Sequence, residues 1–249
     1  MEPVSHSQIL FDVVYERLLR AIIDCTLVPG QRILQSDLAA SLGVSRAPVS
    51  HALQILKRQG LLQESGHKGL AVAPIKPERV RDLYQVRASL DGLAALMAAE
   101  RSAKKQMSKS ESDLLRHTFE AGTKLGDETA MFKRAEADIA FHSAIYKICG
   151  NSAIAETLEP IWPHVQRAMA LVLQADASLK QAWHEHENIM KNILSGRPGE
   201  ASELAFVHTA NAGAYVEGRL RESQQTSHGD RRSPQDVRSG ITAAVSKRG

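Results

Sequence analysis

The sequence predicts a mainly α-helical protein, with an N-terminal winged helix-turn-helix that carries a small β wing and a C-terminal all-α bundle of six or seven helices. Residues 36–58 read SDLAASLGVSRAPVSHALQILKR, two helical segments around a Gly-centred turn. A Gly-bearing stretch follows and reads as two short strands. From residue 79 to 222, apolar residues recur at helical spacing without strand-like alternation.

Composition agrees with this fold class. The 249 residues leave room for two domains of about 150 residues each. Hydrophobic residues make up 43% and aromatic residues only 4%, which favours a helical core rich in Ala and Leu. No apolar run approaches the ~20 residues that span a bilayer, and we expect a cytoplasmic protein with no membrane partner. Cys25 and Cys149 are expected to be reduced, buried thiols.

The winged helix-turn-helix is predicted over residues 1–74. A helix over 8–23 comes first, Ser36 and Ser45 are the expected N-caps of the two motif helices, and residues 61–72 form a hairpin wing. Residues 75–78 are expected to be a linker, because Pro74 and Pro77 bracket it.

The helical bundle is predicted over residues 79–222, with a disordered tail over 223–249 that is rich in Ser, Gln, Gly and Arg. The expected helices cover residues 79–100, about 110–124, 129–148, 152–173 with a break near Pro160 and Pro163, 176–194 and 200–222.

A helix-turn-helix of this kind places the start of its second helix in the major groove of DNA. Arg46 is the strongest candidate for a base contact, because a guanidinium matches O6 and N7 of guanine. The other side chains expected near bases, phosphates or the minor groove are Gln35, Ser36, Ser45, Ser50, His51 and Lys68. The alternative for each of them is an ordinary solvated polar residue.

Residues 29–62, with LAASLGVSRAPVSHALQIL at their centre, resemble the DNA-binding half of the GntR family of bacterial transcription regulators. The family usually has Arg where this chain has Ser50, and an acidic residue where it has Gln35. The resemblance therefore implies an operator preference of its own.

A second constellation lies in the helical half. Asp138 and His142 stand four residues apart and so share a helical face, while His186 and His208 fall on two later helices. Facing helices of a bundle can bring such residues into one pocket, and the set suits a divalent ion such as Zn²⁺, Ni²⁺ or Mn²⁺. Spacing alone leaves open that the Asp/His pair is simply capped or solvated.

The motifs DIAFH, EHENIM and the later A-x-x-x-H, spread over about residues 83–220, resemble the FCD domain of the FadR subfamily of GntR regulators. That resemblance implies a metal held by Asp138, His142, His186 and His208, and a small carboxylate effector that completes the metal's coordination. It also implies that Arg87 contacts the effector, with an interhelical salt bridge as the alternative. Asp91 stands where the family has Glu. Trp162 and Trp183 are expected in the core.

The sequence thus predicts a homodimeric, effector-controlled transcription regulator that binds an operator in double-stranded DNA. Two alternatives stay open. In one, the metal ion itself is the signal. In the other, the protein is a metal-dependent enzyme with a DNA-binding appendage, against which stands the lack of a second base in an obvious motif near the ligands. Neither the effector nor the direction of regulation can be deduced from the sequence.

Overall fold

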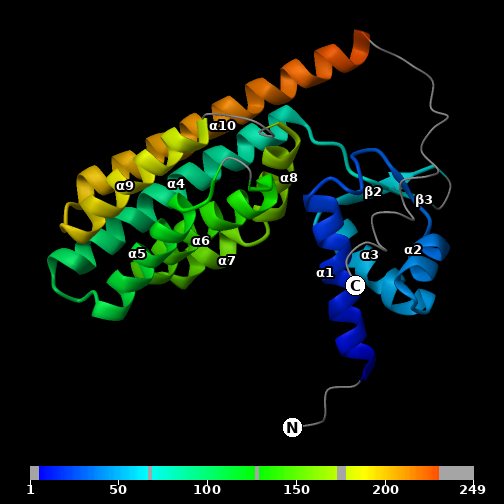
Figure 1. Ribbon diagram of the computed structural model, residues 1–249, viewed down its shortest axis with the longest axis horizontal. Helices are drawn as coiled ribbons and strands as arrows, with labels where there is room; N and C mark the ends of the chain where they lie inside the picture. Colours follow the sequence, from blue (N-terminus) through cyan, green and yellow to red (C-terminus); the bar gives the residue numbers. More distant parts are fainter. Residues whose placement is uncertain (1–5, 67–68, 127–128, 173–177, 230–249) are drawn as a thin grey trace. The chain divides into compact units, whose positions relative to one another are not determined.

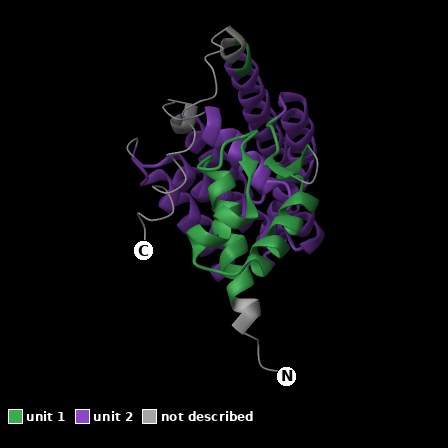
Figure 2. Ribbon diagram, turned by 90° about the vertical axis from the view of Figure 1, so that its right-hand side faces the viewer, with its two compact units in different colours: residues 1–75, 224–249 green, residues 76–223 purple. Residues whose placement is uncertain are grey.

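The structure is a computed structural model that describes residues 6–66, 69–126, 129–172 and 178–229 (Figure 1). The chain divides into two compact units, residues 1–75 with 224–249 and residues 76–223 (Figure 2). Each unit has its own architecture and is described separately.

The first unit is a winged helix-turn-helix. Its helices are α1 (His6–Ile23), α2 (Gln35–Leu42) and α3 (Arg46–Arg58), and its strands are β1 (Arg32–Ile33), β2 (Leu62–Ser65) and β3 (Gly69–Val72). The strands form an antiparallel sheet in the order β1-β3-β2, with Ser65 paired to Gly69 at the end of the predicted hairpin. Apolar side chains of α1 pack against those of α3, and Val14, Leu53 and Leu56 lie at the centre of this core.

The predicted caps and strands of this unit are confirmed only in part. Ser36 is not an N-cap: α2 begins at Gln35, two residues earlier than predicted, after the extended residue Leu34, and the Ser36 hydroxyl donates to Asp37 instead. Ser45 is the N-cap residue of α3, but its side chain makes no capping hydrogen bond. The strand β1 was not predicted, because a two-residue strand has no alternation to detect.

The second unit is an all-α bundle whose described residues contain seven helices, in agreement with the prediction. These are α4 (Pro77–Ala103), α5 (Lys109–Thr123), α6 (Met131–Cys149), α7 (Ser152–Leu158), α8 (Trp162–Val172), α9 (Ser178–Leu194) and α10 (Pro198–Gly229). The long helix α4 contacts α6, α7, α8 and α9, and so forms the centre of the bundle. The predicted break near Pro160 and Pro163 separates α7 from α8.

Helices α4 and α10 pack closely along their length, because glycine allows the two backbones to approach. A Cβ at Gly92 would lie 3.3 Å from the Cβ of Phe206, and a Cβ at Gly213 would overlap the ring of Tyr84. This close approach brings residues near position 91 of α4 next to residues near position 209 of α10.

The ends of two helices differ from the predicted boundaries. Helix α4 begins at Pro77, inside the expected linker, because proline is favoured in the first helical turn, where no backbone N–H is needed. Helix α10 continues to Gly229, past the expected end at residue 222, and residues 230–249 of the expected tail lie outside the described residues. Cys149 is buried as expected, whereas Cys25 is only half-buried, in the turn after α1, with a φ of 58°. None of the described helices is both long and apolar enough to cross a membrane.

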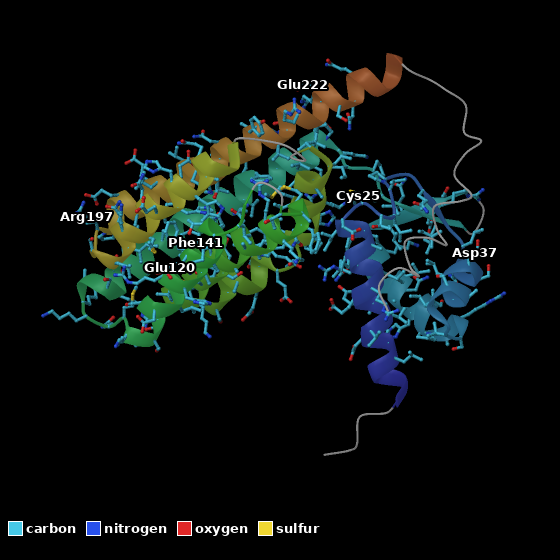
Figure 3. The ribbon with its side chains drawn as sticks, viewed as in Figure 1. Cys25, Asp37, Glu120, Phe141, Arg197 and Glu222 are labelled. Atoms are coloured by element: carbon cyan, nitrogen blue, oxygen red, sulfur yellow. The ribbon has the colours of Figure 1, made fainter. Side chains whose placement is uncertain are left out.

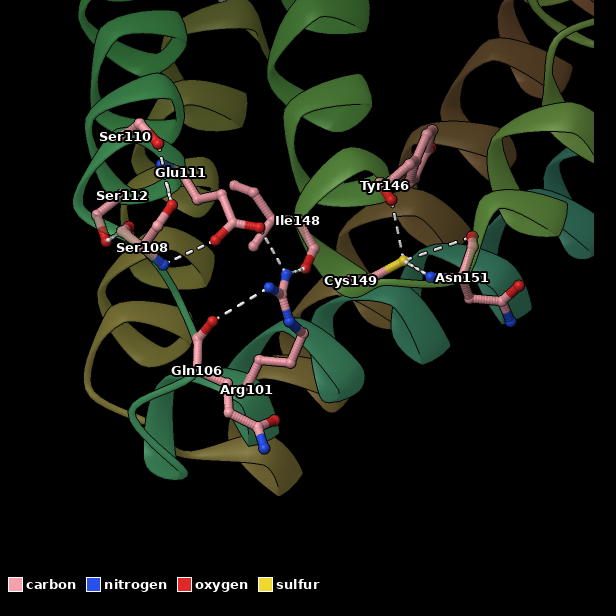
Figure 4. A network of polar contacts seen from close by, with 10 residues as sticks. All are labelled: Arg101, Gln106, Ser108, Ser110, Glu111, Ser112, Tyr146, Ile148, Cys149 and Asn151. Carbon is pink, nitrogen blue, oxygen red and sulfur yellow. Dashed lines mark hydrogen bonds and ion pairs between the residues drawn. The ribbon is translucent and has the colours of Figure 1, made fainter.

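Arg101 of α4 connects this helix to α5 through an ion pair and to α6 through a hydrogen bond (Figure 4). Nη1 of Arg101 lies 2.7 Å from Oε1 of Glu111, and the same guanidinium donates to the backbone carbonyl of Ile148. Glu111 also completes a capping box with Ser108 at the start of α5. Arg101 and the Ser108 backbone lower the pKa of the Glu111 carboxyl to about 2.

Candidate functional site

The four predicted metal ligands meet inside the bundle. Asp138 and His142 come from α6, His186 from α9 and His208 from α10, and one ligand atom of each lies within 4.8 Å of the others. Nε2 of His186 is 3.4 Å from Oδ1 of Asp138 and 3.0 Å from Nε2 of His208. The structure therefore brings together residues that the sequence separates over three helices.

Burial determines the protonation state of two histidines in this cluster. His142 and His186 are 1% and 0% exposed, and burial lowers the pKa of both imidazoles well below their usual range. They are neutral at pH 7, which is the form that binds a metal ion. Burial also raises the pKa of the Asp138 carboxyl, although the nearby positive charge of Arg87 opposes that shift.

The residues present fit a divalent ion. Two ligands of a tetrahedral ion with bonds of about 2.1 Å lie roughly 3.4 Å apart. The distance between Nε2 of His186 and Oδ1 of Asp138 is 3.4 Å. Among the described residues, Nε2 of His142 is buried without a hydrogen-bond partner and lies 3.9 Å from Oδ1 of Asp138. A buried polar atom without a partner costs about 1–3 kcal/mol, and coordination would satisfy it.

Asp91 of α4 connects the cluster to its surroundings. Its carboxylate accepts a hydrogen bond from the Tyr146 hydroxyl and a 2.6 Å hydrogen bond from Oγ1 of Thr209. Oδ2 of Asp91 also lies 3.5 Å from Nδ1 of His142. A carboxylate beside the second nitrogen of a ligating histidine is a common support of metal sites, because it fixes the orientation of the ring.

Arg87, the predicted effector contact, points into the same region. Its Nε lies 3.2 Å from Oδ2 of Asp91, and its Nη2 lies 3.8 Å from Oδ2 of Asp138. The guanidinium carbon stands 4.3 Å from the ring centroid of Trp162, a cation–π distance. Burial by itself would lower the pKa of Arg87, but the acidic groups around it, Asp91 foremost, together outweigh burial, and the pKa lies above its usual value. Arg87 is therefore a buried cation at the edge of the cluster.

Aromatic rings pack against the cluster, and one of them, Phe141, lies within the helical bundle (Figure 3). Phe141 stacks on His186 with ring centroids 4.5 Å apart, and Trp183 lies edge-on to His186 at 4.8 Å. Trp162 is 6.1 Å from His142. Trp162 is buried, as expected for a core residue, whereas Trp183 is half-buried, and both also pack against residues of the cluster.

The side chains predicted to contact DNA differ in their exposure to solvent. Ser45 and Arg46 are exposed at the start of α3, and Ser50 is half-buried one turn further. His51 is exposed, but its ring stacks on Phe11 of α1 with centroids 4.3 Å apart. The stacking turns His51 toward α1, which sets it apart from the other predicted contacts.

The remaining predicted contacts lie at the start of α2 and in the wing. Gln35 is half-buried and Ser36 exposed, while Lys68 lies outside the described residues. The exposed Gln54, four residues beyond Ser50 on the same helical face, was not singled out from the sequence. The DNA contacts of all these residues stay predictions.

Comparison with known proteins identifies a family for each of the two parts of the chain. Residues 82–211 match the FCD domain family, and residues 10–72 match the gntR family of bacterial regulatory proteins. The chain belongs to the FCD family and is a GntR-type transcriptional regulator.

Sequence matches to curated relatives span most of this regulator's chain. The HTH-type transcriptional regulator YdhC of Bacillus subtilis is 23% identical over 211 residues, which cover 85% of this chain and 92% of YdhC. A regulator from an unstable DNA locus of Streptomyces ambofaciens is 29% identical, over 74% of this chain and 75% of its own. These families and relatives are transcriptional regulators and not enzymes, which overturns the enzyme alternative.

Solved structures share the fold of the regulator. Escherichia coli McbR/YncC superposes with a TM-score of 0.67 at 17% identity, covering 88% of this chain and 100% of that one. A putative GntR regulator from Rhodococcus sp. RHA1 superposes with a TM-score of 0.64 at 24% identity, covering 84% and 98%.

Several residues of the regulator's FCD domain were missed from the sequence. No sequence pattern singled out Tyr146 or Thr209, and Asp91 stood out only as a departure from the family pattern. Thr209 follows a predicted ligand directly, which is a weak signal. The hydrogen bond from Thr209 of α10 to Asp91 of α4 joins residues that are 118 positions apart in the sequence. No local sequence pattern predicts such a pairing.

Proposed function

We propose that this regulator controls transcription through a small carboxylate effector that binds at a metal-containing pocket of the FCD domain, as in the FadR subfamily. The observation that carries the proposal is the meeting of Asp138, His142, His186 and His208 within 4.8 Å, beside the buried cation Arg87. A divalent ion there would supply a Lewis-acidic position for a carboxylate oxygen.

The chain's own residues would select the effector. Arg87 offers planar N–H donors that match a carboxylate, and the ring of Trp162 supports its guanidinium. Its distance of 3.8 Å from Asp138 places this cation next to a predicted ligand. A small anion at the cluster would therefore also meet a positive charge, which favours carboxylates over neutral metabolites.

Control of DNA binding requires that the effector bind two states of the regulator with different affinity. Two relatives are named for the operons that they regulate, the probable D-xylose utilization repressor of Paenarthrobacter nicotinovorans and the Nta operon regulator of Aminobacter aminovorans. These names support an operon as the target of this chain.

We also propose a cytoplasmic homodimer that reads a two-fold symmetric operator. Large apolar side chains are exposed on α4 and α10, namely Val86, Leu93, Leu204, Phe206, Val207 and Tyr215. Exposed apolar patches of this kind are typical of protein interfaces. Light scattering of the purified chain tests this state, and a monomer at operator-binding concentrations would contradict it.

The test of the proposed function combines elemental analysis with gel shifts. We expect purified protein to retain a divalent metal, and a panel of small carboxylates to include at least one that changes its affinity for its own upstream promoter. His142→Ala should abolish metal retention and the effector response. The control His184→Ala changes an exposed histidine of α9 and should preserve both.

Two results would redirect the proposal. If metal alone alters operator affinity and no carboxylate adds to the effect, the ion itself is the signal. If protein loaded with Zn²⁺, Ni²⁺ or Mn²⁺ in turn retains none of them, the pocket is not a metal site.

A further inference from the structure

Both ring nitrogens of His208 make close polar contacts, one with His186 and the other with Glu185. Its Nε2 faces the cluster, 3.0 Å from Nε2 of His186. Its Nδ1 points the other way and lies 2.6 Å from Oε2 of Glu185. Since a carboxylate only accepts hydrogen bonds at pH 7, Nδ1 of His208 is the donor in this pair.

This contact fixes which nitrogen of His208 is free to bind a metal. A neutral imidazole carries one proton, so a proton held on Nδ1 by Glu185 leaves the lone pair on Nε2. That lone pair points into the cluster. The negative charge of the carboxylate also makes the ring a better donor to a cation.

Glu185 is itself held in place. Nε2 of Gln181, one turn earlier on α9, donates to Oε1 of Glu185 over 3.2 Å. Glu185 precedes His186 in the chain, so consecutive residues of one helix contact opposite sides of the His208 ring. The Glu185 side chain is 33% exposed, which places it at the rim of the cluster.

The other two histidines of the cluster are supported less closely. Nδ1 of His142 lies 3.5 Å from Asp91, a longer contact. Nδ1 of His186 is buried and, among the described residues, has no hydrogen-bond partner. His208 therefore has the shortest carboxylate contact of the three.

We propose that Glu185 is a positioning residue of the metal centre, which holds His208 in the orientation and tautomer that direct Nε2 at the ion. This inference rests on the proposed metal site and assigns a role to a residue outside the four ligands. Loss of such a support typically weakens metal binding about 10- to 100-fold.

The chain offers a matched control on the same helix. Glu187 is 35% exposed, close to the exposure of Glu185, and pairs with the surface residue Lys191 at 2.7 Å. Glu185→Ala and Glu187→Ala are thus the same chemical change at similar exposure, two residues apart. Only the first removes a contact to the cluster.

The first measurement is the Zn²⁺ affinity of the full-length protein, by competition with a chromophoric chelator. We expect Glu185→Ala to weaken binding about 10- to 100-fold. Glu185→Gln should lose less, because its amide oxygen still accepts from Nδ1, and Glu187→Ala should match wild type. Wild-type affinity in Glu185→Ala would overturn the proposal.

A second measurement does not depend on metal. In metal-free protein labelled with ¹⁵N-histidine, NMR shifts report which nitrogen of each ring is protonated. We expect His208 protonated on Nδ1 in wild type and in Glu187→Ala, and a shift toward the other tautomer in Glu185→Ala. An unchanged His208 signal would refute the positioning role. If wild type binds no Zn²⁺, the proposed metal site fails, whereas this measurement still decides the role of Glu185.

Discussion

Oδ2 of Asp91 lies 3.2 Å from Nε of Arg87, one helical turn away on α4, and both side chains are at least 97% buried. Asp91 also accepts hydrogen bonds from Tyr146 and Thr209. It is therefore the counter-ion of a buried cation and the acceptor for two neighbouring helices. The structure gives this carboxylate a larger role than the family pattern alone suggested.

We predict that Asp91→Ala destabilises the protein by about 3–5 kcal/mol, because it leaves the buried Arg87 charge with one carboxylate fewer. Urea denaturation followed by circular dichroism measures the loss. The control is Asp82→Ala, which removes a carboxylate of the same helix that is 51% exposed and pairs with Arg81. Surface pairs contribute about 0–1 kcal/mol, so similar losses in the two variants would contradict the assignment.

Glu111 makes stability depend on pH. Its pKa is lowered from 4.5 to about 2, so the ionised carboxylate stabilises the fold above pH 4.5 and this contribution is lost as the pH falls through 2. We expect Glu111→Gln to cost about 1 kcal/mol at pH 7, since the pair with Arg101 is partly exposed. The difference from wild type should shrink between pH 4.5 and 2.

Unfolding curves across this pH range measure the effect of the Glu111 substitution. Glu120→Gln, at an exposed position of the same helix, serves as the control. A deficit in Glu111→Gln that stays constant down to pH 2 would show that the ion pair is not its source.

Gly122 of α5 lies against Trp183, which packs on the proposed ligand His186. A Cβ at this position would overlap the indole of Trp183, whose ring packs on His186. Alanine is a better helix former than glycine by about 1 kcal/mol, but overpacking costs about 1–3 kcal/mol. We therefore expect Gly122→Ala to lower both the melting temperature and the Zn²⁺ affinity.

The matched variant for this position is Gly126→Ala. A Cβ at Gly126 meets no atom within 4 Å, so the substitution should leave both properties unchanged. A Gly122→Ala protein that melts above wild type would mean that the indole can move aside freely.

Arg46 tests the DNA-binding assignment. It is exposed at the first position of α3, where a side chain can reach base edges. We predict that Arg46→Ala weakens operator binding by about 1–3 kcal/mol and relaxes preference at one base pair. Fluorescence anisotropy with operator variants measures both. Arg58→Ala, exposed at the opposite end of α3, should retain base preference, and a loss of preference there instead would reverse the assigned geometry.

The sequence predicted the fold because its patterns are local. Helical periodicity, Gly43 and Gly60 after the motif helices, and the proline break between α7 and α8 each act over a few residues. The four candidate metal ligands were predicted through a resemblance to the FCD pattern, since spacing alone left their meeting open. The caps were predicted less well: the predicted N-cap Ser36 is two residues too late, because the extended residue is Leu34 and α2 begins at Gln35.

The sequence by itself determined the fold class, the membership of a DNA-binding family and the identity of the candidate ligands. The tertiary structure alone decided which groups on other helices surround those ligands: Asp91 beside His142, Thr209 on Asp91, Glu185 on His208, and Trp162 near His142. These contacts join helices far apart in the chain, and the contact of Thr209 with Asp91 depends on the close packing of α4 with α10 that Gly92 and Gly213 permit. Local propensity carries no information about such pairings, because they arise only when the helices pack.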